Sequence, residues 1–111
     1  MPGRSPAVVK RPQAVVDIYR HAEYLADRTS LAVAKRFLKA VEQAVNQLAK
    51  SPGLGTPWGG DDPRLAEMRF SPVGRFRNHV IFYHPLPKGG VMIVRVLHRA
   101  QDIEALFDAQ D

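Results

Sequence analysis

The chain has 111 residues, of which 45% are hydrophobic and 24% are charged. This length suits one domain around a single core, and the composition is that of an ordinary folded protein rather than a disordered, collagen-like or membrane protein. Sixteen lysines and arginines against eleven aspartates and glutamates give a net charge of +5, which favours an acidic partner such as RNA, DNA or an acidic protein. Many proteins with such an excess bind no nucleic acid, so charge alone does not choose among these partners.

Several classes of site are excluded by composition. The sequence has no cysteine, so it forms no disulfide and has no thiol nucleophile or cysteine-based metal site. Its four histidines do not follow a zinc-ligand spacing, and we expect neither a metal nor a cofactor. The first residues lack an apolar targeting segment, and the longest apolar runs fall far below the roughly 20 residues of a membrane-spanning helix. We therefore expect a cytoplasmic protein with no membrane contact.

The first half of the chain predicts a short strand and two helices. Residues 1–6 are expected to be a flexible lead-in, followed by an edge strand at Ala7–Lys10. A helix over about residues 12–28 is indicated by Pro12, which suits a first helical turn, and by apolar residues at helical spacing after it. Thr29 or Ser30 can cap a second helix, which ends before Pro52. The link is so short that the two helices should form an antiparallel hairpin.

The second helix is amphipathic. Its apolar stripe consists of Ala34, Phe37, Leu38, Val41, Val45 and Leu48. The opposite, polar face is expected to carry Lys35, Lys39, Glu42, Gln43 and Asn46. The apolar stripe should pack against the rest of the domain.

The second half predicts three strands and a tail. A loop from Gly53 to Pro63 contains Trp58, and period-two alternation then predicts a half-buried strand over 65–70. The apolar segments 78–83 and 91–97 read as central strands joined by a hairpin over 85–90. The tail over 101–107 is predicted to be a short helix or a docked extension. The fold class is therefore α+β, with the helical hairpin packed on one face of a small, twisted, mainly antiparallel sheet in a single domain over residues 1–111.

Four segments together resemble a known family. They are the helix from Pro12 to Leu25 with its two tyrosines, the turn Ser51-Pro52-Gly53-Leu54-Gly55, the strand Phe76-Arg77-Asn78-His79-Val80-Ile81-Phe82-Tyr83, and the run Arg95-Val96-Leu97-His98-Arg99-Ala100-Gln101-Asp102-Ile103. Their order and spacing over residues 6–107 resemble the ParE branch of the ParE/RelE toxins, which belong to type II toxin–antitoxin systems. The resemblance implies the RelE/ParE-like toxin fold.

The ParE resemblance also implies a function. A ParE-like toxin would arrest growth by binding DNA gyrase and trapping its cleaved-DNA intermediate, and would not itself be an enzyme. A ParD-like or similar antitoxin would neutralise it in a hetero-oligomer, by folding a disordered segment over grooves between the helical hairpin and the sheet edge. The residues predicted to contact the target or partner are Trp58, Arg75, Arg77, Arg95, His98 and Arg99.

One alternative to the gyrase inhibitor is a toxin-like fold that has lost toxicity and serves as a binding or regulatory module. The main alternative is a RelE-type ribosome-dependent endoribonuclease. Charged residues on or beside the later strands could form a basic concave patch, namely Glu67, Arg69, Arg75, Arg77, Arg95, His98 and Arg99. In that case Arg69, Arg77 and Arg95 would stabilise the transition state, and His98 would transfer a proton. Two departures oppose this alternative: no lysine lies between Lys50 and Lys88, and no tyrosine follows Leu97.

Three of these residues also have purely structural interpretations. His98 would end a strand, with its ring held by a backbone carbonyl or by Asp102. Arg95 would pair with a carboxylate of Glu67, Asp102 or Glu104 and fix the C-terminal segment. Trp58 would plug its loop onto the core instead of anchoring a partner.

Overall fold

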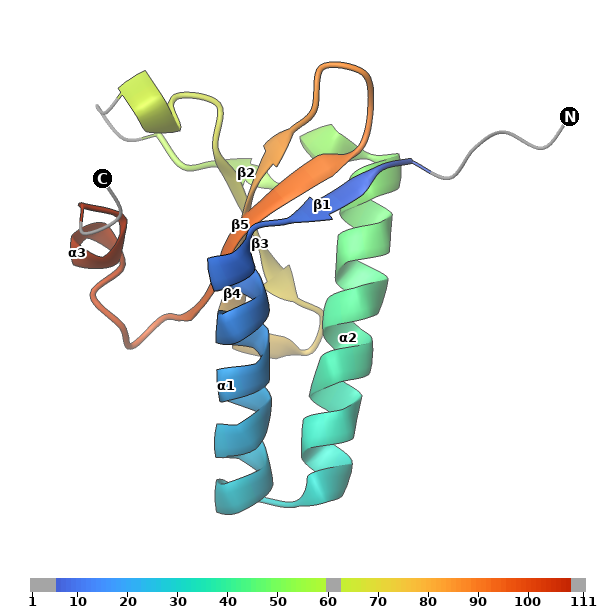
Figure 1. Ribbon diagram of the computed structural model, residues 1–111, viewed down its shortest axis with the longest axis vertical. Coiled ribbons are helices and arrows are strands. Elements are labelled where there is room, and N and C mark those ends of the chain that lie inside the picture. Colours follow the sequence, from blue (N-terminus) through green and yellow to red (C-terminus); the bar gives the residue numbers. More distant parts are fainter. Residues whose placement is uncertain (1–5, 60–62, 109–111) are drawn as a thin grey trace, which may run out of the picture.

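The computed structural model describes residues 6–59 and 63–108, so the predicted lead-in lies, apart from Pro6, outside the described residues. Two long helices stand side by side and support a twisted sheet at one end (Figure 1). The elements in chain order are β1 (Val8–Lys10), α1 (Pro12–Arg28), α2 (Leu31–Lys50), the 3-10 helix η1 (Pro52–Leu54), β2 (Thr56–Pro57), the 3-10 helix η2 (Pro63–Leu65), β3 (Arg69–Val73), β4 (Phe76–Pro85), β5 (Val91–His98) and α3 (Ile103–Asp108).

The helical hairpin forms where the sequence predicts it. Pro12 occupies the first turn of α1, where its missing N–H needs no partner. Between the helices, the Thr29 hydroxyl donates to the carbonyl of Leu25 at 2.6 Å, and the Ser30 hydroxyl accepts from the Val33 N–H at 3.2 Å. Ser30 is therefore the N-cap of α2, while Thr29 closes α1.

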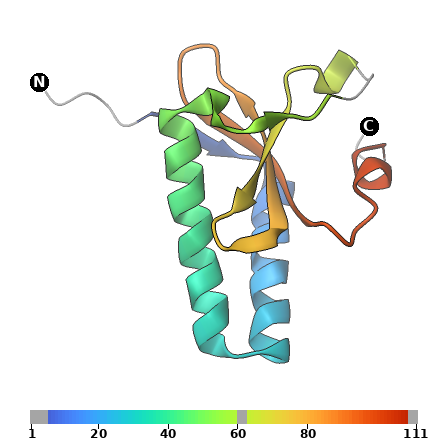
Figure 2. The same cartoon turned by 180° about the vertical axis from the view of Figure 1, so that it is seen from behind.

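The sheet has the strand order β1-β5-β4-β3-β2. β1 runs parallel to β5, and the other neighbouring pairs are antiparallel. The view from behind shows the helices as one layer, with α3 standing apart from them (Figure 2). This arrangement confirms the α+β class and the mainly antiparallel sheet.

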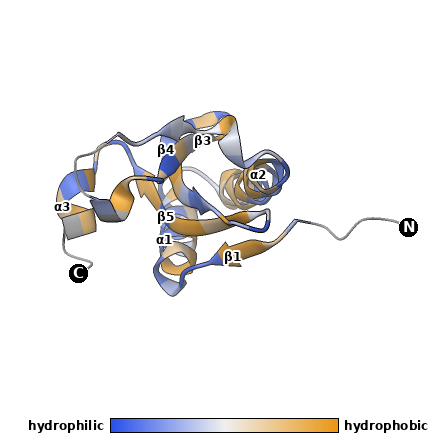
Figure 3. Cartoon of the chain, turned by 90° about the horizontal axis from the view of Figure 1, so that it is seen from above, coloured by the Kyte–Doolittle hydropathy of each residue, from blue (hydrophilic) through white to orange (hydrophobic). Residues whose placement is uncertain are grey.

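Two apolar clusters lie on either side of the sheet. The larger fills the space between the helices and the sheet, with Phe37, Leu48 and Ile81 fully buried. The smaller lies on the opposite face, where Met68 and Phe82 pack with Phe107 of α3. Strand β5 is mostly hydrophobic along its length (Figure 3), because it contributes to both clusters. The predicted tail is thus a short helix docked on the second face.

The strand predicted over 65–70 was misplaced. Residues 63–65 form the 3-10 helix η2 and the strand begins at Arg69. Pro63 favours this tight turn because its ring fixes φ, and the Met68 N–H then bonds the Leu65 carbonyl at 3.0 Å. Pro72 is tolerated inside β3 because β2 covers the outer edge of that strand only at Arg69 and Phe70.

An irregularity in β5 sets the direction of its later side chains. Phe82 faces Arg95 across the β4–β5 pair, but the next residue, Tyr83, faces Ile93, so Val94 is an extra residue in the strand. Such a bulge resets the alternation of side chains. Without it, the simple period-two pattern assigns Val96 and Leu97 to the wrong faces, since Val96 lies in the larger cluster with Ile93 and Leu97 in the smaller one with Val94.

Candidate functional site

Arg95 is buried at the α1–β5 seam, which we define as Asp17 and His21 of α1 with Arg95 and Val96 of β5. The Arg95 guanidinium donates from Nε to Asp17 Oδ2 at 2.7 Å and from Nη2 to Oδ1 at 2.9 Å. The Val96 N–H donates to the same carboxylate at 3.0 Å, and the His21 Nε2–H donates to the Val96 carbonyl at 2.8 Å. β1 ends at Lys10, opposite Ile93, so α1 takes over the role of a neighbouring strand along the edge of β5.

The seam explains how the apolar strand β5 can contain a charged residue, Arg95. Arg95 and Asp17 are each 6% exposed, and a buried charge is tolerated when it is paired and hydrogen-bonded. The partners expected from the sequence, Glu67, Asp102 or Glu104, were wrong, because the carboxylate comes from α1. Arg95 is consequently part of the packing and not part of an exposed basic surface.

His21 of the seam begins a row of three imidazoles that contact one another edge to face. The ring centroids of His21 and His79 are 4.9 Å apart, as are those of His79 and His98, with near-perpendicular planes in both pairs. His79 also lies 4.9 Å from the ring of Phe37. Burial, reinforced by the two neighbouring imidazoles, lowers the pKa of His79 to about 4. Burial likewise lowers the pKa of His21, so the two rings are neutral near pH 7.

His98 forms hydrogen bonds within the turn that follows β5. Its Nδ1 accepts a hydrogen bond from the Ala100 N–H at 3.0 Å, and its backbone N–H donates to Gln101 Oε1 at 2.7 Å. The ring is therefore held by a backbone N–H, not by a carbonyl or by Asp102 as expected. Because the Nδ1 lone pair is occupied, the neutral ring carries its proton on Nε2. This arrangement leaves no free lone pair for a general base.

Arg69 is also held by internal contacts. Its Nη1 donates to the carbonyl of Gly55 at 2.6 Å and to that of Gly53 at 3.3 Å. The buried Tyr83 hydroxyl braces the same loop, since it donates to the Pro52 carbonyl at 2.7 Å and accepts from the Gly55 N–H at 2.8 Å. A Cβ at Gly55 would lie 2.5 Å from that hydroxyl, so the close approach requires glycine. Arg69 thus fixes η1 and its junction with β2.

Two arginines remain exposed together at the end of the β4–β5 pair. Arg99 donates from Nε to the carbonyl of Arg77 at 2.9 Å, and its backbone N–H bonds the Asn78 carbonyl at 2.8 Å. Both side chains are exposed. We call this pair, Arg77 and Arg99, the basic corner. The expected concave patch is thus divided, because Arg69 and Arg95 are engaged elsewhere, Arg75 lies in a separate groove, and Glu67 lines a shallow hollow beside Pro85 and Leu86.

Trp58 packs inward. Its ring lies 5.2 Å from Phe82 and 5.8 Å from Phe70, both edge-to-face, and 6.4 Å from Phe107. The backbone N–H of Trp58 donates to the Met68 carbonyl at 2.8 Å. The side chain is half-buried in the second cluster and joins the loop to α3.

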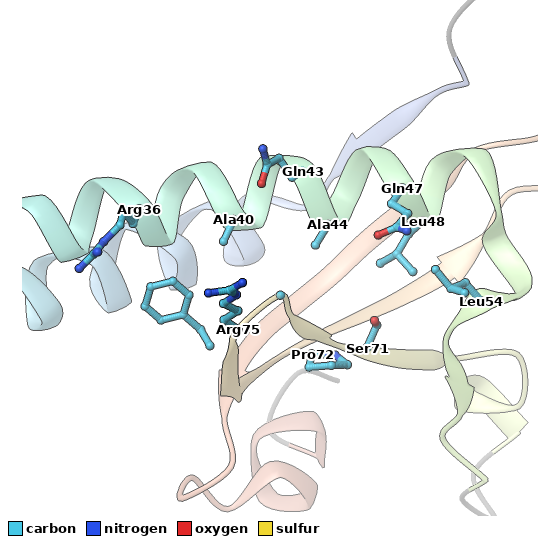
Figure 4. Close-up of a pocket in the computed structure, with 12 residues that line it drawn as sticks. Arg36, Ala40, Gln43, Ala44, Gln47, Leu48, Leu54, Ser71, Pro72 and Arg75 are labelled. Carbon is cyan, nitrogen blue, oxygen red and sulfur yellow. The ribbon is translucent and has the colours of Figure 1, made fainter.

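A groove of about 520 Å³ separates α2 from β3 (Figure 4). Its walls come from α2, η1, β3 and the turn between β3 and β4. The lining residues are Arg36, Ala40, Gln43, Ala44, Gln47, Leu48, Leu54, Ser71, Pro72, Gly74, Arg75 and Phe76. The floor is apolar and two arginines project at one end, while the lining contains no aspartate or glutamate. We call this the α2–β3 groove.

Sequence reasoning identified Arg75 but missed the residues of α2 in this groove. Gln43 was expected on the outer face, and Arg36 and Gln47 were not considered. A signal was present, because Ala40 and Ala44 are small residues beside the apolar stripe and leave α2 without bulk there. The position of β3 opposite them depends on the tertiary structure.

Other classes of site were also sought. Within residues 6–59 and 63–108, no three side chains of the metal-ligating types are grouped closely enough to hold an ion. In the same part of the chain, no helix is both long and apolar enough to cross a membrane.

Comparisons with known proteins identify one family and one shared fold. A sequence model described as "ParE toxin of type II toxin-antitoxin system, parDE" matches residues 8–103. Among solved structures, a chain of the "Chromosomal ParDE TA system from P. aeruginosa" superposes with a TM-score of 0.68 at 13% identity, covering 85% of this chain and 96% of that one. At this identity the structural match shows the fold alone. A search of curated proteins found no significant match.

Proposed function

Since this chain belongs to the ParE toxin family of type II toxin–antitoxin systems, we propose that it inhibits DNA gyrase by binding to it and is neutralised by a cognate antitoxin. The observation that carries the proposal is the separation of the groups that a nuclease would need. Of the four residues considered for RNA cleavage, two arginines are held by internal contacts and His98 is held in its own turn.

The chemistry of RNA cleavage explains why this separation matters. A base must remove the 2′-hydroxyl proton, and cations must gather around one phosphate as charge develops. Arg95 is bonded to Asp17 and Arg69 to the Gly53 and Gly55 carbonyls, on different elements, so neither guanidinium is available for a common phosphate. His98 offers no free lone pair as a base. Inhibition by binding requires none of these groups.

The basic corner is the surface that we assign to the target. Arg77 and Arg99 are both exposed, and two hydrogen bonds hold Arg99 beside the start of β4: its side-chain Nε donates to the Arg77 carbonyl and its backbone N–H donates to the Asn78 carbonyl. Exposed guanidiniums suit bidentate recognition of carboxylates or phosphates. A gyrase–DNA complex offers both carboxylates, from the protein, and phosphates, from the DNA.

The α2–β3 groove is the surface that we assign to the antitoxin. Its apolar floor and open length suit an amphipathic segment that folds on binding. The groove lies where such a segment was expected, between the helical hairpin and an edge of the sheet. Because the two surfaces are separate, the bound antitoxin would block gyrase binding either through its bulk or by changing the conformation of the basic corner.

The experiment uses the purified chain in two parallel assays. In the first, supercoiling by gyrase is followed with detection of linearised plasmid; in the second, messenger RNA is recovered from translating ribosomes. We expect linear DNA to accumulate while RNA stays intact. Cut RNA with unaffected gyrase would overturn the proposal.

Two variants sharpen this test. His98→Asn keeps an oxygen that can accept from the Ala100 N–H but cannot transfer a proton, so linearisation should persist. Arg77→Ala together with Arg99→Ala should lower linearisation about tenfold or more, because two exposed contacts are removed. Circular dichroism of both variants checks that folding is unchanged. If the unaltered chain cut messenger RNA on ribosomes and His98→Asn did not, the result would support the nuclease instead.

A further inference from the structure

We propose that Arg36 and Arg75 form a carboxylate clamp at one end of the α2–β3 groove, and that it binds an acidic side chain of the antitoxin segment. The clamp would fix the direction in which that segment lies, with its acidic end at the two arginines and its apolar residues toward Leu54. The identity of the partner rests on the proposed function, whereas the clamp rests on the geometry and charge of the groove.

The charge of the groove is uncompensated. Its lining holds two arginines, two glutamines and a serine, with no carboxylate among them. In the part of the chain that the structure describes, neither Arg36 nor Arg75 forms an ion pair within 4.0 Å or a side-chain hydrogen bond. Arg69, Arg95 and Arg99, by contrast, each donate to an oxygen of the chain itself. The two groove arginines therefore keep their full hydrogen-bonding capacity for a ligand.

The two arginines approach the groove from different walls. Arg36 projects from α2 and Arg75 from the turn between β3 and β4, and both lie at the same end of the groove (Figure 4). Gly74 makes that turn with φ of +50°, and a Cβ built on it would lie 3.8 Å from the Cβ of Ala40. The turn is thus seated against α2, and Arg75 rises from the wall that faces this helix, while the Arg36 side chain extends from α2 toward the outer end of the groove (Figure 4). Guanidiniums on two walls suit a carboxylate held between them.

The opposite end of the groove carries its two leucines, with Gln47 beside them (Figure 4). Leu48 and Leu54 lie there, and Ala40 and Ala44 line the stretch between (Figure 4). From Arg36 to Leu48 the axis of α2 rises about 18 Å, the length of roughly three helical turns. The groove therefore matches an amphipathic segment with apolar residues along one side and an acid at one end.

The open edge of β3 also limits how the segment can bind. Pro72 stands beyond the last residue that β2 covers, and it has no N–H with which to pair an added strand. Side chains, not a continuous backbone ladder, must therefore supply most of the contacts in the groove. A helical segment meets this requirement because its own backbone is already hydrogen-bonded.

The test measures binding of the purified cognate antitoxin to variants of the full chain by calorimetry. Arg36→Ala together with Arg75→Ala should weaken binding about tenfold to a hundredfold at low salt, because two charge-assisted contacts are lost. High salt should narrow the difference, since screening weakens the same contacts in the unaltered chain. Thermal unfolding verifies that the double variant is folded.

The matched control removes two cations from the same helix outside the groove. Lys35 and Lys39 are exposed on α2 and do not line the groove, so Lys35→Ala together with Lys39→Ala should change affinity less than about threefold. Equal losses in the two double variants would overturn the clamp and indicate only a general attraction between opposite charges.

A charge exchange tests the direction of the segment. Arg36→Glu together with Arg75→Glu should bind poorly, and replacing one acidic residue of the antitoxin with arginine should restore binding to this variant alone. Failure of every such replacement would overturn the clamp. If the unaltered chain bound no antitoxin, neutralisation itself would fail; if it bound normally but the double alanine variant bound equally well, only the clamp would fail.

Discussion

The two helices of the hairpin meet the sheet in different ways. α1 closes onto β5 through the seam, where one carboxylate accepts from a guanidinium and from a backbone N–H. α2 contacts the core with its apolar stripe, but it leaves the α2–β3 groove open beside it. Two arginines consequently have opposite roles, because Arg95 on β5 is 6% exposed whereas Arg75, in the turn between β3 and β4, is exposed.

The chemistry available to a charged residue depends on the partners that the fold gives it. At the seam the protein has already satisfied every donor of Arg95 that points to α1, so this residue stabilises the fold. In the groove no such partner exists among the described residues, so the charge is free to bind a ligand. Residue type and strand position alone do not separate these cases.

Removing the carboxylate of the seam should have the largest effect. Asp17→Ala leaves the Arg95 guanidinium buried without its partner and the Val96 N–H without an acceptor. We expect the free energy of unfolding to fall by about 3 to 5 kcal/mol in chemical denaturation. The matched control is Asp27→Ala, an exposed carboxylate on the same helix, which should change stability by less than about 0.5 kcal/mol. Similar losses in both variants would contradict this account of the seam.

Acid should lower the free energy of unfolding, because burial makes the histidines at and beside the seam resist protonation in the folded protein. The pKa of His79 is lowered from 6.5 to about 4, so the folded protein binds fewer protons than the unfolded chain between these values. The free energy of unfolding should therefore decrease as the pH falls from about 6.5 to about 4, and His21 acts in the same direction. Urea denaturation at pH 7, 6 and 5 measures the loss.

A single variant separates His79 from the other titrating groups. His79→Leu fills this buried position with an apolar side chain that cannot bind a proton, so the loss of stability between pH 7 and pH 5 should become smaller. The rings facing His79, those of His21 and His98, remain in place, as do Asp17 and Arg95 beside His21. An unchanged pH dependence would assign the acid sensitivity to a different group.

On the side of the groove, the turn that holds Arg75 should be moderately sensitive. Gly74 has φ of +50°, a conformation that costs an L-residue about 1 kcal/mol. Gly74→Ala should lower the free energy of unfolding by that amount, since the added Cβ meets nothing closer than 3.8 Å. Gly53→Ala is a suitable control, because no atom lies within 4 Å of a Cβ there and its φ is not positive. A loss above about 3 kcal/mol would indicate a steric clash rather than backbone strain.

The smallest effect is expected for the groove arginine itself. Arg75→Ala removes a side chain with no partner among the described residues, so stability should stay within about 0.5 kcal/mol of the unaltered protein. Arg95→Ala, measured beside it, should lose several-fold more, because it leaves Asp17 buried and unpaired. Comparable losses in the two arginine variants would remove the distinction between seam and groove.

The helices were predictable because their signals are local. Pro12, Ser30 and the stripe that includes Phe37 and Val41 act within one or two turns, and the resulting bounds agree with α1 and α2. The strand before β4 was misplaced because alternation over 65–70 reflects burial of Met68 in a turn as well as pairing at Phe70. The family was likewise evident from the order of segments along the chain, and the sequence match over residues 8–103 confirms it.

By itself, the sequence determined the α+β class, the helical hairpin and membership of the ParE family, since periodicity, caps and segment order depend on neighbours along the chain. Only the tertiary structure decided which charged residues are available. Asp17 and Arg95 are 78 residues apart in the sequence, and they meet because α1 covers the edge of β5 beyond Ile93. Arg36 and Arg75 likewise share a groove because a glycine turn seats β3 against α2. Such pairings depend on the bulge, the register and the open edges of the sheet, and these have no local sequence signal.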